Sequence, residues 1–156
     1  MEQSQFLQLV NEHQGIIHKI CRLYRNSRED REDLFQEIVF QLWKSAPGFG
    51  GRAQFSTWLY RVALSTALAG YRKKAIPVIY MEALPEQQAD NTPRDEQQQQ
   101  LWQALTKLPD ADKAIIALYL ENLSYQEIAD ILGITHSNVG VKLNRAKSRL
   151  QQLLKQ

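Results

Sequence analysis

The stretch LSYQEIADILGITHSNVGVKLNRAKSRL, residues 123–150, has the pattern of two helices joined by a tight turn. Ser124 and Glu127 have the spacing of a capping box, in which side chain and backbone satisfy each other's hydrogen bonds at a helix start. Gly133 predicts the end of this first helix, because glycine adopts the left-handed conformation of a helix C-cap without steric cost. Thr135 is a candidate N-cap for the second helix. The stretch therefore predicts a helix-turn-helix.

The second predicted helix has one apolar face and one polar, basic face. The residues that recur at helical spacing and predict its inward face are Val139, Leu143, Ala146 and Leu150. The polar residues near its start, which could meet base edges in a major groove, are His136, Ser137, Asn138 and Lys142. The later cations, which lie where phosphates could be met, are Arg145, Lys147 and Arg149.

Charge separates a DNA-binding motif from a plain helical hairpin, which is the alternative for two short helices joined by a glycine turn. Residues 131–156 include no aspartate or glutamate, although five of them are lysine or arginine. A helix that is merely solvated usually mixes both signs of charge. The distribution of charge therefore favours nucleic-acid binding.

The overall composition limits the classes of protein to be considered. The 156 residues suffice for one ordinary domain or two small ones, each with a thin core. The formal net charge is only +2, yet residues 48–81 also lack acidic side chains, and the acidic zones are 29–37 and 82–96. This alternation is typical of a chain that meets an anion at two places and a basic partner at a third.

Cysteine content and hydropathy predict a cytoplasmic location. The single Cys21 excludes an internal disulfide and suits a reducing compartment. No apolar run approaches the roughly 20 residues of a membrane span, and the first residues, MEQSQF, do not resemble a signal peptide. We therefore expect a soluble protein without membrane insertion.

The first half of the chain predicts helices over residues 4–24 and 30–44. The first helix is amphipathic and contributes to the core. It contains His13, His18 and Cys21, but the sequence has no second pair of ligands at metal-binding spacing, so no metal site is expected. The inward residues of the second are Leu34, Phe35, Ile38, Val39 and Leu42. Its opposite face has Asp33, Gln36, Glu37 and Phe40, with Trp43 at the border. This face predicts either a docking patch for a basic protein or, equally well, packing of Phe40 against the first helix.

A third helix is predicted over residues 55–74, with Ser56 as its cap. The expected core residues are Phe55, Trp58, Leu59 and Val62, and the expected outward residues are Tyr60, Leu64, Ala67 and Tyr71. Arg61 and Arg72 flank the outward side, and aromatic rings between cations suit a single-stranded nucleic acid. The alternative is that some of these rings belong to the core. Three prolines in residues 76–95 then predict a linker.

Several motifs together resemble the extracytoplasmic-function (ECF) sigma factors of bacterial RNA polymerase. They are DLFQEIVFQLW (33–43), FSTWLYRVA (55–63), LPDADKAIIALYLENLSYQEIADILGI (108–134) and LNRAKSRL (143–150). Distinct motifs in the family's order are a far more specific signal than a helix-turn-helix alone. The resemblance implies an all-α fold of two small helical domains joined by a flexible linker. The expected ranges are an N-terminal domain at 1–75, a linker at 76–95 and a C-terminal domain with the helix-turn-helix at 96–156.

The resemblance also implies a role for individual residues. The expected contacts with core polymerase are Asp33, Gln36, Glu37, Phe40 and Trp43. The expected contacts with the -10 promoter element are Tyr60, Arg61, Ser65, Tyr71, Arg72 and Lys73. The expected contacts with the -35 element are Ser124, His136, Ser137, Asn138, Lys142, Arg145 and Arg149. Ser65 and Ala69 depart from the Asn and Asp that many relatives have there, so no base preference is carried over.

These observations predict a sigma factor, a non-enzymatic subunit that binds core RNA polymerase, recognises promoter DNA and assists melting. An anti-sigma factor is a further partner that the family allows. The alternative is a one-component helix-turn-helix regulator, which would not need the acidic face around Phe40. An enzyme is a weaker third hypothesis, because the sequence offers no nucleophile with a base, phosphate loop or metal cluster, and no cofactor is expected.

Overall fold

The computed structural model describes residues 2–51, 54–69 and 95–155. These residues form helices and connecting segments without any β-strand, as the predicted all-α fold requires. The chain divides into two compact units, Met1–Asp90 and Asn91–Gln156. The predicted linker lies outside the described residues apart from Asp95, and the predicted domain boundaries stay predictions.

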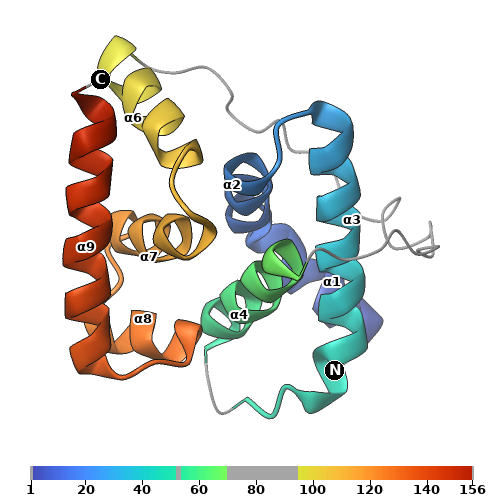
Figure 1. The fold of residues 1–156 in the computed structure, drawn as a ribbon. Helices are drawn as coiled ribbons and strands as arrows, with labels where there is room; N and C mark the ends of the chain where they lie inside the picture. The colour runs from blue at the N-terminus through green and yellow to red at the C-terminus, as the bar shows by residue number, and fades with distance from the viewer. Residues whose placement is uncertain (1, 52–53, 70–94, 156) are drawn as a thin grey trace. The chain divides into compact units, whose positions relative to one another are not determined.

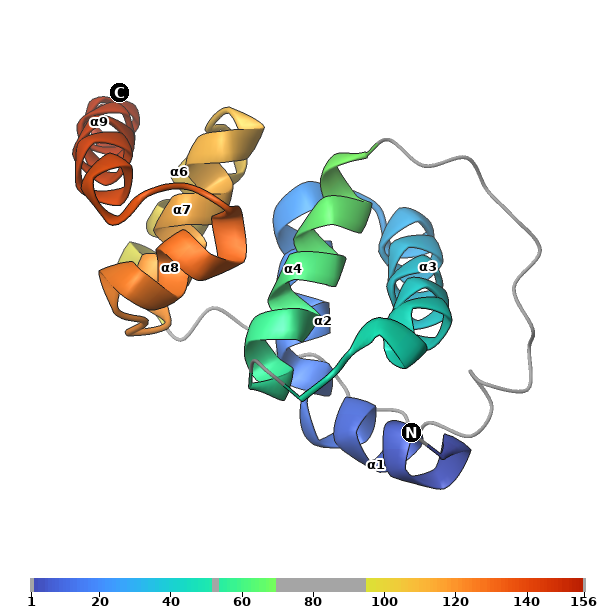
Figure 2. The same ribbon diagram turned by 90° about the horizontal axis from the view of Figure 1, so that it is seen from below.

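The N-terminal unit is a small helical bundle. Its elements are α1 (Gln3–Glu12), α2 (Gln14–Tyr24), α3 (Arg28–Ser45), the 3-10 turn η1 (Ala46–Gly48) and α4 (Phe55–Leu68). Helices α2, α3 and α4 contact one another pairwise, and α1 lies at the end of the bundle where α3 finishes (Figures 1 and 2). The largest fully buried side chains of this unit include Phe6, Ile17, Leu34, Ile38, Leu42 and Leu59. Apolar residues spread over all of these helices therefore build one core.

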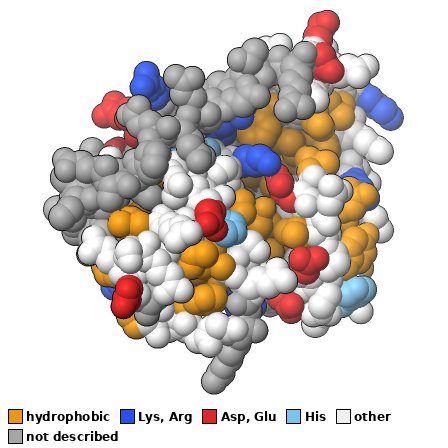
Figure 3. Space-filling model, turned by 180° about the vertical axis from the view of Figure 1, so that it is seen from behind, with side chains coloured by type: hydrophobic (Ala, Val, Ile, Leu, Met, Phe, Trp, Pro, Cys, Tyr) orange, Lys and Arg blue, Asp and Glu red, His pale blue; other side chains and the backbone are white. Residues whose placement is uncertain are grey.

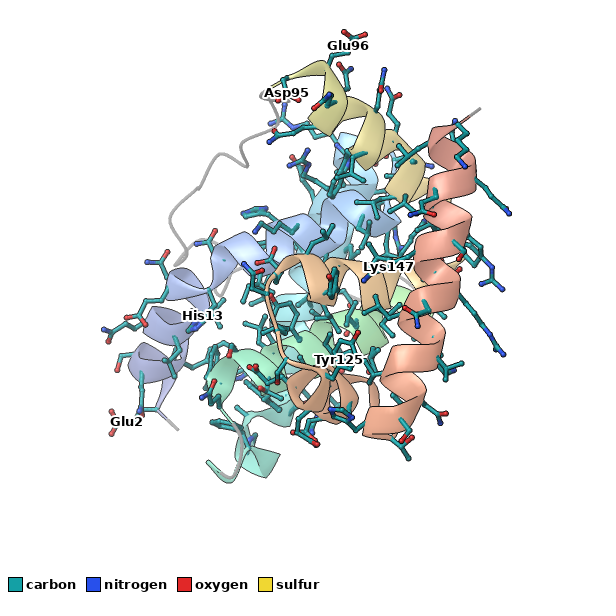
Figure 4. All side chains as sticks on the ribbon, turned by 90° about the vertical axis from the view of Figure 1, so that its left-hand side faces the viewer. Glu2, His13, Asp95, Glu96, Tyr125 and Lys147 are labelled. Atoms are coloured by element: carbon teal, nitrogen blue, oxygen red, sulfur yellow. The ribbon has the colours of Figure 1, made fainter. Side chains whose placement is uncertain are left out.

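The single helix predicted over residues 4–24 is wrong, because the chain breaks at His13 between α1 and α2 (Figure 4). The φ and ψ angles of His13 are −111° and 15°, outside the helical region. Its ring nitrogen Nδ1 lies 2.8 Å from the carbonyl oxygen of Leu9, and Gly15, a poor helix former, follows. The apolar residues keep helical spacing on both sides of the break, so periodicity alone could not reveal it.

Helix α3 begins two residues before its predicted start. The Ser27 hydroxyl accepts a hydrogen bond from the Asp30 N–H at 3.1 Å and so caps the helix. Glu29 and Asp30 then lie in the first turn, where the helix dipole favours negative charge. All five residues predicted to face inward are buried, namely Leu34, Phe35, Ile38, Val39 and Leu42.

The C-terminal unit contains α6 (Glu96–Thr106), α7 (Asp110–Leu120), α8 (Tyr125–Leu132) and α9 (His136–Leu154). Helix α9 is the longest of these and contacts each of the other three. Figure 1 shows α6, α7 and α8 on the same side of α9. Asp95 caps α6 by accepting a hydrogen bond from the Gln98 N–H at 2.7 Å. Pro109 occupies the N-cap position of α7, and Asp110 is the first residue of the helix.

The structure confirms the predicted helix-turn-helix in its local hydrogen bonds. The Ser124 hydroxyl accepts from the Glu127 N–H at 3.1 Å, and the Glu127 carboxylate accepts from the Ser124 N–H at 3.0 Å. Gly133 ends α8 in the left-handed region with a φ of 70°, and Thr135 caps α9 at 3.1 Å from the Asn138 N–H. The inward residues of α9 are Val139, Leu143 and Ala146, all fully buried, while Leu150 is half-buried.

Within the described ranges, no helix combines the length and apolar character that a membrane crossing needs.

Candidate nucleic-acid and polymerase interfaces

The start of α9 presents polar side chains to solvent. The four predicted base-reading residues and the first of the later cations are all exposed: His136, Ser137, Asn138, Lys142 and Arg145. The fully buried Val139 and Leu143 fix the rotation of α9 against the unit, so that these polar residues must point outward. Among the described residues, neither Lys142 nor Arg145 has an ion pair with a carboxylate. This side of α9 therefore suits an anionic partner.

Arg149 differs from the other predicted phosphate contacts, because it has a partner inside the protein. Its guanidinium donates a hydrogen bond to the Asp112 carboxylate of α7 at 2.6 Å. The Asp112 side chain is 11% exposed and that of Arg149 54% exposed, so the pair is partly shielded from water. The structure thus gives Arg149 a role in joining α9 to α7, and its contact with phosphate stays a prediction.

Lys147 also faces α7. Its ammonium nitrogen lies 4.0 Å from the centroid of the Tyr119 ring, within the range of a cation–π interaction. Two cations in the second half of α9, Lys147 and Arg149, therefore bind side chains of α7 within the same unit. Lys142 and Arg145, nearer the middle of the helix, are therefore the exposed cations of α9 that pair with no carboxylate or aromatic ring of the described residues.

The first turns of α9 are held against α8 by Tyr125. The ring centroids of Tyr125 and His136 are 5.7 Å apart. A Cβ atom added to Gly140 would lie 3.7 Å from Cε2 of Tyr125, an ordinary contact distance. Position 140 therefore faces α8, and the next residue along the helix faces away from it.

The predicted polymerase-docking face of α3 is less exposed than the helical pattern indicates. Glu37 is only 1% exposed, so the expectation that it lies on an outward face is wrong. One carboxylate oxygen accepts a hydrogen bond from Nε2 of Gln41 at 2.9 Å, and no described group donates to the other. Burial of a charged group without full hydrogen bonding costs free energy, which makes Glu37 an unusual core residue.

The aromatic end of this face packs partly within the protein. Trp43 is half-buried, and its ring centroid lies 4.9 Å from that of Phe6 in α1. Phe40, Asp33 and Gln36 keep intermediate exposure. Packing against α1 is thus seen at Trp43, whereas Phe40, the residue of the packing alternative, remains accessible in part.

The predicted orientation of α4 is wrong. Tyr60, Leu64 and Ala67 were expected to face outward, but all three are buried, and Tyr60 is only 8% exposed. Helix α4 contacts both α2 and α3, so its buried surface is wider than one apolar stripe. Arg61 and Ser65 are exposed, and the helix starts after Gln54 without the predicted Ser56 cap. The predicted residues Tyr71, Arg72 and Lys73 lie outside the described residues.

An aromatic cluster lies where the loop after α3 meets the start of α4. The ring centroids of Phe49 and Trp58 are 4.9 Å apart, and those of Phe55 and Trp58 are 5.4 Å apart. His13 joins the cluster at 5.0 Å from Phe55. These rings are half-buried, whereas the sequence predicted Phe55 and Trp58 as core. Phe49 was missed, because a loop residue has no periodicity to mark it.

The ionisable groups inside the N-terminal unit match a structural role. Burial raises the pKa of the Cys21 thiol to about 12, which keeps it protonated at neutral pH. Burial also lowers the pKa of His18, whose ring stacks on Phe35 with centroids 4.7 Å apart. Within the part of the chain that the structure describes, no three His, Cys, Asp or Glu side chains form a group suited to a metal ion.

Surface charge is mixed on the face drawn in Figure 3, where exposed hydrophobic side chains alternate with acidic and basic ones.

Comparison with protein families gives two matches in the order expected from the motifs. Residues 9–76 match Sigma-70 region 2, and residues 98–150 match Sigma-70 region 4. The chain is 30% identical to the ECF RNA polymerase sigma factor SigM of Mycobacterium tuberculosis over 151 residues, which cover 96% of this chain and 76% of SigM. This chain belongs to the ECF sigma factors. It is also 28% identical over 174 residues to SigW of Bacillus subtilis, covering 99% of this chain and 91% of SigW.

Solved structures support the same fold. The sigma factor resembles CnrH, solved in complex with the cytosolic domain of CnrY, with a TM-score of 0.70 at 21% identity over 99% of this chain and 90% of CnrH. It also resembles RpoE of Bartonella quintana, solved with the anti-sigma factor NepR, with a TM-score of 0.64 at 20% identity over 97% and 96% of the respective chains. As a sigma factor, the protein binds core RNA polymerase and directs it to promoters. The match to region 2 favours this function over the one-component regulator.

Proposed function

We propose that this sigma factor docks on core polymerase through α3, handles the -10 element with α4 and the residues after it, and reads the -35 element with α9. The proposed docking residues at the surface are Asp33, Gln36, Phe40 and Trp43. Glu37 is buried, and one of its oxygens has no donor among the described residues, so its proposed role is to offer that oxygen to a basic group of the polymerase when docking uncovers it. The proposed -10 residues are Arg61, Ser65, Tyr71, Arg72 and Lys73. Because Tyr60 is buried, its proposed role is to hold α4 in place for its exposed neighbour Arg61.

The observation that carries the -35 assignment is the exposed surface at the start of α9. His136, Ser137 and Asn138 follow the N-cap directly, and Lys142 lies one turn further along. The first residues of a recognition helix are those that reach base edges when the helix enters a major groove. Ser124 is exposed at the start of α8, where its hydroxyl caps the helix, so a phosphate contact there stays a proposal.

Transcription in vitro tests the function directly. Purified protein added to core polymerase should direct initiation from its own promoters and from no others, while core polymerase alone should not initiate there. A regulator that binds duplex DNA unaided would instead bind without the polymerase and would not confer initiation. That outcome would contradict the assignment of promoter recognition to a polymerase complex.

Asn138→Ala should change which -35 sequences are used. An asparagine amide on a recognition helix can make two hydrogen bonds to adenine, and losing such a pair alters base choice by roughly 1 to 3 kcal/mol. The measurement is transcription from a library with a randomised -35 region. Identical sequence preferences for wild type and Asn138→Ala would remove Asn138 from the base-reading residues.

Arg145→Ala and Arg149→Ala form a matched pair on α9. Arg145 is exposed and has no carboxylate partner among the described residues, so Arg145→Ala should weaken binding to all promoters alike. The slope of log affinity against log salt concentration should fall by about the amount that one phosphate contact contributes. Arg149→Ala should leave the buried Asp112 carboxylate without its partner and lower the free energy of unfolding by about 1 to 3 kcal/mol. Salt titrations and denaturant unfolding of both variants measure the difference. Equal salt slopes for Arg145→Ala and wild type would contradict the assignment.

We further infer a cytoplasmic site of action, where the polymerase and the chromosome are found, and no catalytic activity of the protein itself. An anti-sigma factor is a proposed partner, since both CnrH and RpoE were solved in complexes and RpoE's partner NepR is an anti-sigma factor. Co-purification with a membrane or soluble inhibitor, reversed by the inducing condition, would test this partner.

A further inference from the structure

Val141 is an apolar side chain in the middle of the polar face of α9. Its side chain is 49% exposed. The other exposed large hydrophobic residues within the described ranges each lie in the last two positions of a helix: Leu68, Tyr119, Leu120 and Leu154. Exposed apolar residues are ordinary at such ends, where the chain leaves the packed core. Val141 is five residues inside a long helix, so this explanation does not apply to it.

The position of Val141 on α9 is fixed by its neighbours. Val139 and Leu143 on either side of it are fully buried, and position 140 faces Tyr125 of α8. Val141 therefore points outward. Residues three and four apart share one face of a helix, so Val141 lies one turn after Asn138 and one turn before Arg145, between the proposed base-reading residues and a proposed phosphate contact.

The chemistry of a valine suits one feature of the major groove. β-Branched residues are weaker helix formers than alanine or the long polar residues, so helix stability gives no reason for a valine at an exposed position. The only apolar group that base pairs present in the major groove is the C5-methyl group of thymine. We propose that Val141 is a specificity-determining residue that packs on a thymine methyl group in the -35 element. This inference rests on the proposed function of α9 and adds a base preference to it.

The test removes the methyl group from the DNA instead of changing the protein alone. Holoenzyme assembled from the full chain first selects its preferred -35 sequence from a randomised library. Each thymine of that sequence is then replaced by deoxyuridine, which keeps every hydrogen-bonding group and lacks only the methyl. Binding is measured for wild type, for Val141→Ala, and for Leu154→Ala as the matched control, which removes exposed apolar surface from the end of the same helix.

We expect deoxyuridine at one thymine, or at two adjacent ones, to weaken wild-type binding about 4-fold, the factor that corresponds to burial of one methyl or methylene group. Val141→Ala should bind the thymine sequence more weakly and lose most of this difference between thymine and deoxyuridine. Leu154→Ala should retain the difference in full. Because Val141 is exposed and alanine is the better helix former, the alanine variant should unfold at the wild-type temperature or slightly above it.

Three results would overturn the inference. The selected -35 element could require no thymine, deoxyuridine could bind wild type as well as thymine does, or Val141→Ala could keep the full methyl penalty. In each of these cases the holoenzyme still selects a -35 sequence, so the proposed function of α9 survives. A wild-type holoenzyme that selects no -35 sequence would instead overturn the proposed function and the inference together.

Discussion

Replacing Tyr60 with alanine will lower the free energy of unfolding by about 3 kcal/mol. Tyr60 is 8% exposed and lies on α4 among fully or largely buried neighbours such as Leu59 and Ala63. Truncating a buried aromatic ring removes its apolar burial and leaves a cavity, which together cost roughly 3 to 5 kcal/mol. Denaturant unfolding followed by circular dichroism measures the loss.

The neighbouring residue provides the control for Tyr60. Arg61 is exposed, so Arg61→Ala should leave stability close to wild type while weakening the hold on single-stranded -10 DNA. Permanganate reactivity of unpaired thymines, on a normal promoter and on one with a pre-melted bubble, measures promoter opening. Tyr60→Phe should open promoters like wild type because it keeps the packed ring. A Tyr60→Ala variant that is fully stable but fails to open promoters would show that Tyr60 contacts DNA.

Replacing Glu37 with lysine will lower both stability and polymerase binding. Glu37 is 1% exposed, so the lysine ammonium would be buried, and among the described residues the hydrogen-bond partner at this position is the side-chain amide of Gln41. Leaving a buried charge without a partner costs several kcal/mol. Reduced polymerase affinity of this variant would therefore reflect loss of the native fold as well as loss of a contact. Unfolding curves measured beside polymerase affinity should show both losses.

Glu37→Gln separates these effects. Glutamine has nearly the same size, and its side-chain oxygen can still accept from Gln41. A neutral amide costs less to bury than a carboxylate with one unsatisfied oxygen, so stability should stay equal or rise by about 1 kcal/mol. Core polymerase affinity should nevertheless fall, since the proposed docking pairs this carboxylate with a basic group of the polymerase. Phe40→Ala removes a half-buried proposed docking side chain from the same helix and should also lower polymerase affinity. Unchanged affinity of Glu37→Gln would remove Glu37 from the docking surface.

Local interactions explain which parts of the fold could be predicted from the sequence. The capping box of Ser124 and Glu127, the left-handed Gly133 and the Thr135 cap each depend on residues within three or four positions of one another. Such hydrogen bonds form wherever the helix forms, so the motif itself specifies them. Helix α3 likewise kept its predicted inward face, because five apolar residues at helical spacing leave only one way to bury them.

Contacts between helices decided the rest. The pair of Arg149 with Asp112 joins residues 37 positions apart, and no local pattern marks either of them as a partner of the other. Tyr60 and Glu37 lie on faces that a helical projection assigns to solvent, yet both are buried. Hydrophobic periodicity gives the relative rotation of side chains around one helix, whereas the number of sides that neighbouring helices cover depends on the packing of the whole unit. Residues close together in the sequence therefore specify the helix-turn-helix and the family motifs, whereas the packing of each unit fixes the exposure of the predicted contact residues.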